Sequence, residues 1–567
     1  MKRSQCWFLI ALGAILFGAP PPGHAQETGA FEASVASVPS VSHEAARQLE
    51  ASGHSLDELL EEVDRRVQAR AGLGREIVDK LFSFGELGMQ EFATFDYLVS
   101  LLRENGFEVE EGIVGIPTAW WATWGSGSPV IALGSDIDGI PRASQKPGVA
   151  YHDPIVADAP GHGEGHNSGK AVTIMAALAL KEVMEEEGIE GTIALWPGVA
   201  EEQLATKAWY VRDGYFDDVD ATIFTHVSNN LGVSWGGNRG SGLVSVEFYF
   251  EGEAAHGASP WRGRSALDAV ELLSVGWNYW REHMRPLQRS HSVITDGGDQ
   301  PNVVPPFASV WYYVREVDFE HLRENFDAIL RIAEGAAMMT ETEMSYRIIG
   351  QAAPRHFSRP IAEAMGPHID AVGLPEWSRE DLALAKAVQL EVGSEPTGLN
   401  TEATGVRGPP EEPTSGGSDD IGDISWAVPT VTLGFPSNMP GLQGHHWSNS
   451  ITMATPIAHK GVEAGARVLA RTALEMYLRP EIVADAWDYF ENVQSEEQEY
   501  YSFIGPDDPP ATHLNRETMD RFRPELEPFH YDETRYGTYL EQLGIEYPTL
   551  RPDQWEAVEP LLGELDD

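Results

Sequence analysis

The first part of the chain alternates between helix-like and strand-like hydrophobic patterns. Apolar residues recur every three to four positions over 59–84 and again over 94–107, which predicts two helices. Strand-like apolar runs follow at 118–125, 129–136, 191–198 and 220–227. Between them, the segment 168–188 is apolar nearly all round, which predicts a buried helix. Helices that alternate with buried strands predict an α/β sheet, whose ligands bind beyond the carboxyl ends of the strands.

A different order of elements occupies the middle of the chain. Strand, helix, strand, strand, helix and strand patterns occur in turn at 241–252, 265–284, 291–298, 308–317, 319–339 and 343–350. This β-α-β-β-α-β order predicts a ferredoxin-like domain inserted into the α/β domain. The α/β pattern then resumes with a strand-like run at 429–436 and a long helix over 454–478.

The predicted fold class is therefore α/β: a mixed-sheet main domain with helices on both faces, interrupted by a ferredoxin-like (α+β) domain. A chain of 567 residues is too long for one ordinary core. The predicted divisions are a signal peptide at 1–25, the main domain at 56–236 and 351–480, the inserted domain at 237–350 and an acidic C-terminal extension at 481–567.

The N-terminus has the parts of a secretory signal. Lys2 and Arg3 form a basic start, the run CWFLIALGAILFGA is apolar, and a small-residue cleavage site ends at Ala25. The apolar run is too short to span a membrane, so we expect a secreted or periplasmic protein without a membrane span. Cys6 is the only cysteine and lies within the signal. The mature chain would therefore have no disulfide and no thiolate for catalysis or metal binding.

Acidic residues greatly outnumber basic ones. The chain has 88 Asp and Glu against 39 Lys and Arg, a formal net charge of −49. Such a surface repels nucleic acid and anionic membranes, which excludes both as partners. The acids could attract cationic substrates, but they are spread along the chain rather than clustered. This distribution favours a role in solubility.

The segment 160–169, PGHGEGHNSG, places three side chains that can bind metal at alternate positions. In an extended segment, His162, Glu164 and His166 would project to the same side. The intervening glycines allow tight backbone conformations near a bound group. A glycine-rich loop with incidental histidines fits the same pattern.

Further candidates stand at the ends of the predicted strands. Glu201 and Glu202 follow one strand, and His226 ends the next. A metallohydrolase needs one carboxylate to hold metal and another to take a proton from water, and adjacent residues at a strand end can point in two directions. An acidic pair at a strand end, or a histidine within a core, would give the same local pattern.

Several motifs in a fixed order resemble one family of enzymes. They are SDIDGIP at 135–141, GHGEGHN at 161–167, Glu201-Glu202, His226, AHGASP at 255–260, NVVP at 302–305, GSDD at 417–420 and GHHW at 444–447. Together they resemble the aminoacylase and carboxypeptidase family of co-catalytic metallopeptidases, and within it the amidohydrolase branch. The resemblance covers roughly residues 56–480. It implies two divalent metal ions per chain, zinc or manganese.

The resemblance also implies residue roles. The implied metal ligands are Glu164, His166, Glu202, His226 and His445, with His446 as the alternative to the last. Glu201 matches the general base. A cysteine stands at the position of Glu164 in this branch, so the carboxylate is a departure that leaves the identity of the metal open.

Other residues are implied to lie around this centre. Those that would contact the substrate are His256, Asn302 and Arg315. His256 often comes from the partner subunit of a dimer in this family. Asp136 or Asp138 would orient a ligand histidine, and His162 would lie behind the ligands without touching the metal.

The implied reaction is hydrolysis of an amide bond by a metal-activated water. The substrate would be an N-acyl amino acid, such as aminobenzoyl-glutamate, or a dipeptide. The main domain would be catalytic, and the inserted domain would be the lid and dimerisation domain of a homodimer. One alternative is a catalytically inactive relative that binds peptides or metal. Another is a metalloenzyme acting on phosphates or sugars, although the chain has no glycine-rich loop followed by Lys and Ser or Thr.

Overall fold

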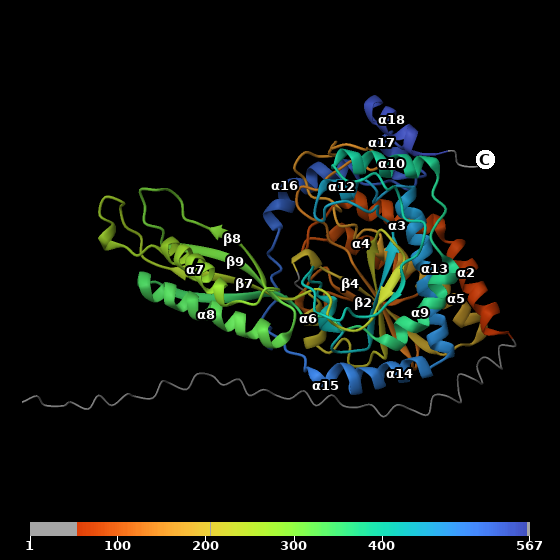
Figure 1. Ribbon diagram of the computed structural model, residues 1–567, viewed down its shortest axis with the longest axis horizontal. Coiled ribbons are helices and arrows are strands. Elements are labelled where there is room, and N and C mark those ends of the chain that lie inside the picture. Colours follow the sequence, from red (N-terminus) through yellow and green to blue (C-terminus); the bar gives the residue numbers. More distant parts are fainter. Residues whose placement is uncertain (1–53, 204–205, 564–567) are drawn as a thin grey trace, which may run out of the picture. The chain divides into compact units, whose positions relative to one another are not determined.

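A computed structural model describes residues 54–203 and 206–563, so the predicted signal peptide lies outside the described residues. These residues form two sheets (Figure 1). The larger sheet has the order β1-β2-β4-β3-β5-β12-β6-β11. Its strands are β1 (Glu108–Glu111), β2 (Trp120–Ser126), β3 (Val130–Asp136), β4 (Gly191–Gly198), β5 (Ala221–Ser228), β6 (Gly232–Ser234), β11 (Gly405–Arg407) and β12 (Thr430–Pro436). Parallel pairing in the centre and antiparallel pairing of β1, β2 and β4 confirm the predicted mixed sheet.

Helices pack around this sheet. They are α2 (Leu56–Gln68), α3 (Ala71–Phe84), α4 (Phe92–Glu104), α5 (Gly169–Glu187), α6 (Lys207–Arg212), α9 (Arg359–Val372), α10 (Arg379–Glu391), α11 (Ile421–Ile424), α12 (Trp447–Ser450) and α13 (Pro456–Leu478). Helix α5 contacts three strands as well as α2, α3 and α13, which explains its apolar character all round. In the described part of the chain, no helix combines the length and the apolar character that crossing a membrane requires.

The continuous helix predicted over 59–84 is wrong, because the structure divides it between α2 and α3. The apolar period runs through the junction, so the pattern alone does not reveal the break. Gly72 and Gly74 lower the helix propensity just after it. Gly74 also faces Met175 of α5 so closely that an added Cβ would lie 2.3 Å from the sulfur. The glycine therefore permits close packing of α3 on α5.

The smaller sheet has the order β10-β7-β9-β8 and carries two helices on it. Its elements are β7 (Gly242–Glu251), α7 (Ala266–Trp280), β8 (Arg289–Asp296), β9 (Phe307–Glu316), α8 (Phe319–Thr340) and β10 (Glu343–Ala352). The three neighbouring pairs are antiparallel. The order β-α-β-β-α-β and the antiparallel sheet agree with the predicted ferredoxin-like fold.

The C-terminal extension packs against both sheets' domains. Its helices are α14 (Glu481–Tyr489), α15 (Ser495–Glu497), α16 (Arg516–Leu526), α17 (Tyr539–Leu543) and α18 (Pro552–Val558). The Tyr500 hydroxyl donates to Asp423 of α11, and Arg347 of β10 donates to the carbonyls of Pro509 and Pro510. The phenyl ring of Phe503 lies edge-on to Phe326 of α8. The extension therefore ties the smaller sheet to the main domain.

Candidate metal centre and active site

The candidate ligands gather at one edge of the large sheet. Strands β3, β4 and β5 are parallel, so their carboxyl ends meet there. His226 lies near the end of β5, and Glu201 and Glu202 follow β4 in a short 3-10 turn. Ala200, just before them, has a φ of +54°, a left-handed conformation that is uncommon for a residue with a Cβ. This turn directs the chain so that both carboxylates stay at the strand ends.

Overlapping groups of ligand atoms form at this edge, with the atoms of each group within 4.8 Å of one another. The groups are Glu164, Glu202 and His445; His166, Glu201 and Glu202; and Asp136, His166 and His226. The Nε2 of His445 lies 3.0 Å from a carboxylate oxygen of Glu202 and 3.7 Å from one of Glu164. The ring centroids of His166 and His226 are 5.5 Å apart. All five ligands expected from the sequence thus lie in these groups.

Asp138 contacts two of the ligand residues, one through its side chain and one through its backbone. Its Oδ1 lies 3.2 Å from the Nδ1 of His166, and its Oδ2 accepts a hydrogen bond from the backbone N–H of Glu202. The Nδ1 of His226 is similarly held, 2.9 Å from the carbonyl oxygen of Val227. When one ring nitrogen is held in this way, the other is free to bind metal. The geometry favours Asp138, rather than Asp136, as the residue that orients a ligand histidine.

The centre has buried polar atoms without partners among the described residues. They include the Nε2 of His166 and the Oε1 of Glu202. Burial raises the pKa of the Glu202 carboxyl. Burial lowers the pKa of His166, but the contact with Asp138 and the charges of Asp136 and Glu202 outweigh it and raise that pKa to about 10. Buried acids around an unpartnered nitrogen are the arrangement that a cation stabilises, so these residues fit a metal site.

Glu201 stands beside the candidate ligands. Its carboxylate lies 3.9 Å from the Nε2 of His166 and is buried. Burial raises its pKa well above the ordinary value, and the negative charges of Asp419 and Asp136 add to this effect. A carboxyl whose pKa is raised in a cleft can exchange a proton near neutral pH, as a general base requires.

A second group of acids lies on the other side of Glu201 and contains its own cation. The Nζ of Lys207 lies 2.6 Å from Asp136 and 3.8 Å from Asp419, and it also pairs with Asp420. Lys207 and Asp420 are fully buried. The oxygens of Glu201, Asp419 and Asp420 lie close enough together to hold a metal. The Lys207 ammonium already supplies the positive charge there.

The remaining histidines expected at the site have other surroundings. His162 is buried with its Nε2 3.0 Å from the carbonyl oxygen of Leu81, and it belongs to none of the ligand groups. Burial lowers its pKa to about 4. His446 caps α12, whereas its neighbour His445 reaches Glu202.

The residues expected to contact substrate are divided. Arg315 of β9 lines the cavity at the metal centre, with its guanidinium 5.6 Å from the ring centroid of Tyr313. The Tyr313 hydroxyl donates to the carbonyl oxygen of Glu202 at 3.4 Å. His256 and Asn302 are exposed on the smaller domain and do not line this cavity.

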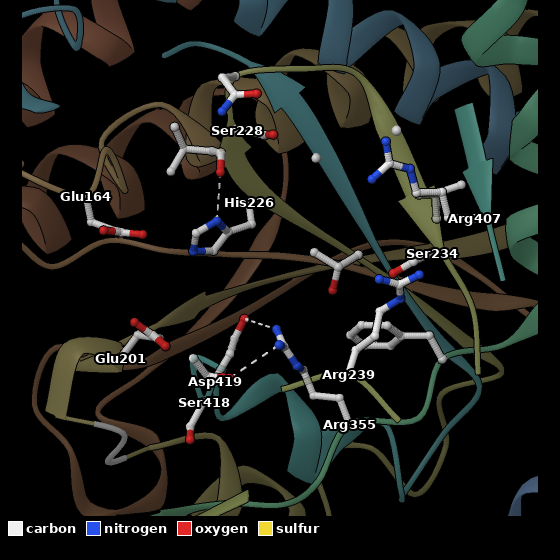
Figure 2. Close-up of a pocket in the computed structure, with 18 of the residues that line it drawn as sticks. Glu164, Glu201, His226, Ser228, Ser234, Arg239, Arg355, Arg407, Ser418 and Asp419 are labelled. Carbon is white, nitrogen blue, oxygen red and sulfur yellow. Dashed lines mark hydrogen bonds and ion pairs between the residues drawn. The ribbon is translucent and has the colours of Figure 1, made fainter. Parts of the chain in front are cut away.

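The cavity has a volume of about 970 Å³ and two chemically different ends. Glu164 and Glu201 lie at one side in Figure 2, and Arg239 and Arg407 lie at the other, with His226 between them. Arg355 lies near Asp419, 3.8 Å between a guanidinium nitrogen and a carboxylate oxygen.

Comparison with known proteins places the chain in a family. Residues 237–338 match the peptidase dimerisation domain of family M20. The chain is 33% identical over 448 residues to one of the subunits of the p-aminobenzoyl-glutamate hydrolase of Escherichia coli (strain K12), which covers 75% of this chain and 93% of that protein. The chain belongs to peptidase family M20. It is thus a member of a family of metal-dependent amidohydrolases and peptidases.

Other M20 relatives support the same assignment. The Xaa-Arg dipeptidase of Mus musculus is 27% identical over 401 residues, which covers 68% of this chain and 80% of that protein. The crystal structure of an aminobenzoyl-glutamate utilization protein from Klebsiella pneumoniae aligns with a TM-score of 0.50 and 19% identity, over 74% of this chain and 99% of that chain. This likeness shows that the M20 fold is shared.

Several residues of the M20 site escaped the sequence reasoning. Lys207 lies in a short helix without any motif, and Arg239, Arg355 and Arg407 lie in segments that the hydrophobic pattern left unassigned. The only sequence signal for this group of residues was the GSDD motif, which contains Asp419. Positive charges spaced along a chain give no local pattern, so their convergence on one cavity follows from tertiary packing.

Proposed function

We propose that this M20 enzyme hydrolyses the amide bond of an N-acyl amino acid or a dipeptide. The observation that carries this proposal is the position of the buried Glu201 carboxylate, 3.9 Å from the Nε2 of His166 at the edge of the ligand groups. A buried base beside unpartnered metal-ligand atoms, in a cavity large enough for a small molecule, suits activation of water against a carbonyl group.

Two divalent ions fit the donor set. Glu164, Glu202 and His445 would hold one ion, and His166 and His226 would hold the second, with Glu202 belonging to two of the ligand groups. Imidazole and carboxylate donors suit zinc and manganese. A bound pair of such ions supplies Lewis acidity and lowers the pKa of water toward neutrality.

The chain's own residues would move the protons. The Glu201 carboxylate takes a proton from the attacking water as the new C–O bond forms. The same proton then passes to the amide nitrogen as the C–N bond breaks, so the products are a carboxylic acid and an amine. The Arg315 guanidinium lines the same cavity and would bind the carboxylate of the amino acid.

We further propose that the active form is a homodimer. Support comes from large apolar side chains exposed on the smaller domain: Trp261 (72%), Tyr279 (78%), Met338 (81%) and Met339 (66%). His256 and Asn302 lie outside the cavity of their own chain. In a dimer they would contact the substrate in the partner's cavity. The basic and apolar residues at 1–25 support secretion or export to the periplasm.

Glu201→Gln tests the proposed reaction. Glutamine keeps the size of the side chain but cannot carry the proton, so turnover of an N-acyl amino acid should fall about a hundred- to ten-thousandfold. Metal content and thermal melting, measured on the same preparation, should stay unchanged. A variant with intact metals and near-normal turnover would remove Glu201 from the reaction. Wild-type protein that binds metal but cleaves no amide in a broad panel would favour the inactive binding relative instead.

A further inference from the structure

The turn that carries Glu201 is held at both of its ends. After Glu201, the backbone N–H of Glu202 donates to the Oδ2 of Asp138 at 3.1 Å. Before it, the backbone N–H of Ala200 donates to the Oε1 of Glu91 at 2.9 Å. Glu91 is fully buried and takes no part in the proposed hydrolysis. We propose that Glu91 is a positioning residue, which fixes the turn at Ala200 and so places the Glu201 carboxylate. This inference rests on the proposed role of Glu201 as the base.

Ala200 is the residue of this turn that needs an anchor. Its φ of +54° lies in the left-handed region, which is unfavourable for a residue with a Cβ. Such a conformation persists only where neighbouring contacts hold it. The Ala200 carbonyl accepts from the N–H of Gln203 at 3.2 Å within the turn, and its own N–H is held by Glu91. Ala200 is buried, so without Glu91 this N–H would have to find another acceptor by moving the backbone next to Glu201.

The Glu91 side chain can reach the turn because another acid caps helix α4. Glu91 is the N-cap residue of α4, a position from which a side chain can accept hydrogen bonds from the first N–H groups of its helix. Glu86 does this instead, because its two carboxylate oxygens accept from the N–H groups of Ala93 at 3.0 Å and Thr94 at 2.9 Å. The Glu91 carboxyl is therefore directed away from the helix, and its Oε2 accepts from the Thr118 hydroxyl at 3.1 Å.

The loop before α4 is itself held against the site and against the C-terminal extension. The Glu86 carbonyl accepts from the N–H of Gly139 at 2.7 Å. Gly88 packs so closely on the turn that an added Cβ would lie 2.7 Å from the Cα of Ala200. From the extension, the Asn515 amide donates to the Gly88 carbonyl at 2.9 Å. The positioning residue thus stands on a loop that is fixed on two sides.

Glu91→Met tests the inference against a matched buried acid. In the metal-loaded variant the Ala200 N–H loses its acceptor, so kcat for an N-acyl amino acid should fall about tenfold to a hundredfold. KM and metal content should not change, because Asp138 still holds the N–H of Glu202. Glu86→Met is the control. It also removes a buried acid that accepts two hydrogen bonds, so it should lower the melting temperature in a similar way but leave kcat near the wild-type value.

Glu91→Gln separates the hydrogen bond from a general effect of substitution. Burial, together with the charge of Asp138, raises the pKa of Glu91 to about 8, so the carboxyl is largely protonated at neutral pH and an amide can replace it. Glutamine keeps an acceptor oxygen for the Ala200 N–H, so its kcat should be close to that of the wild type. If Glu91→Gln lowers kcat as far as Glu91→Met does, the hydrogen bond is not the cause and the inference is overturned.

Hydrogen exchange tests the same contact without any turnover. An N–H that loses its acceptor exchanges faster, so a peptide covering 196–203 should exchange faster in metal-loaded Glu91→Met than in the wild type or in Glu86→Met. If the wild-type enzyme cleaves no amide, the proposed hydrolysis fails, and faster exchange still supports the hold of Glu91 on the turn. Unchanged exchange, or a near-normal kcat in an active enzyme, would overturn the inference. If Glu91→Met does not fold, Glu91→Asp, which is one methylene shorter, is measured with the same expected outcomes.

Discussion

Two clusters of carboxylates flank Glu201, and they differ in where their positive charge comes from. On one side, Asp136, Asp419 and Asp420 surround the Lys207 ammonium. On the other side, Glu164 and Glu202 face His166, His226 and His445, and two of the buried donor atoms have no partner in the described chain. Both clusters bring carboxylate oxygens within metal-binding distance of one another.

The comparison shows that proximity of acids alone does not identify a metal site. A buried carboxylate cluster must be neutralised by a cation, by protons or by hydrogen bonds. Each cluster has buried polar atoms without a partner in the described chain: the Oδ2 of Asp136 in one, and the Nε2 of His166 and the Oε1 of Glu202 in the other. The Lys207 cluster nevertheless contains a cation of the chain itself, whereas the carboxylates of the histidine-containing cluster pair with no described lysine or arginine. The presence or absence of a buried lysine therefore distinguishes the two clusters better than distances do.

The largest expected effect comes from removing the built-in cation. Lys207→Met leaves buried carboxylates without a counter-charge, so the free energy of unfolding should fall by about 3–5 kcal/mol. Denaturant unfolding measures this. When Lys207→Met is refolded at low temperature, it should still bind metal at the histidine-containing cluster.

Lys460→Met is the matched control for that change. Lys460 pairs with the buried Asp381 at 2.7 Å, but its own side chain is 35% exposed. Water can replace it, so the loss should be only about 1 kcal/mol. If the two variants lost equal amounts of unfolding free energy, burial of the ammonium would not determine the size of the loss. If added zinc or manganese restored the stability of Lys207→Met, a metal ion could replace the Lys207 ammonium. The two clusters would then differ only in which cation occupies them.

The second effect is the removal of metal from the histidine-containing cluster. A ligand that binds only the folded state stabilises it by about 3–4 kcal/mol when its concentration is several hundred times Kd. Chelation should therefore lower the melting temperature of the wild-type protein, and saturating zinc or manganese should restore it. Lys207 needs no metal, so chelation should leave the Lys207→Met penalty unchanged. A melting temperature that chelators do not move would contradict the metal centre.

A smaller effect is expected from single residues of the 160–169 loop. Glu164→Ala removes one carboxylate from the group with Glu202 and His445, so about one of two bound ions should be lost. His162→Ala should retain both ions, because the His162 ring lies against the Leu81 carbonyl and outside the ligand groups. Elemental analysis after dialysis measures both. Equal metal loss in the two variants would show that the loop's ligands are assigned wrongly.

The site residues that could be predicted from the sequence are those that lie within one motif or at the end of one strand. The loop at 160–169 and the pair Glu201-Glu202 are local in sequence, and parallel strands bring their carboxyl ends to one edge. The choice between Asp136 and Asp138 could not be made, because spacing does not tell which side chain faces the loop. Asp138 contacts His166, while Asp136 faces Lys207.

The features that could not be predicted from the sequence depend on packing between segments that are distant in the chain. Lys207 meets Asp420 across more than 200 residues of sequence, and Arg239 meets Gly408 across 169. In the described part of the C-terminal extension the longest helix, α16, has 11 residues, so a helical pattern gives little indication of where the extension packs. It is held by scattered apolar residues, such as Val558 and Phe522, and by individual hydrogen bonds, such as those of the Tyr547 hydroxyl to Asp381 and of the Tyr539 N–H to Asp79. Contacts of this kind leave no periodic trace in the sequence.

The smallest expected effect concerns a buried acid that has neither a lysine nor a metal. Asp423 accepts hydrogen bonds from the Gln351 amide, the Tyr500 hydroxyl and the backbone N–H of Ala353. Burial raises its pKa to about 6, although these hydrogen bonds oppose the rise. The unfolded carboxyl has a pKa near 3.9. Between about pH 6 and pH 4 the folded state therefore holds a proton that the unfolded state lacks, so this group adds stability as the pH falls through that window.

Asp423→Asn isolates this contribution. Asparagine keeps an acceptor oxygen and cannot ionise, so the difference in unfolding free energy between variant and wild type should change by about 2 kcal/mol from pH 7 to pH 4, with the wild type gaining relative to the variant toward acid. Denaturant unfolding at several pH values measures it. Other carboxyl groups titrate equally in both proteins and cancel in the difference. If the difference stays constant with pH, three hydrogen bonds are enough to keep Asp423 ionised, and a buried carboxylate at this junction needs no cation at all.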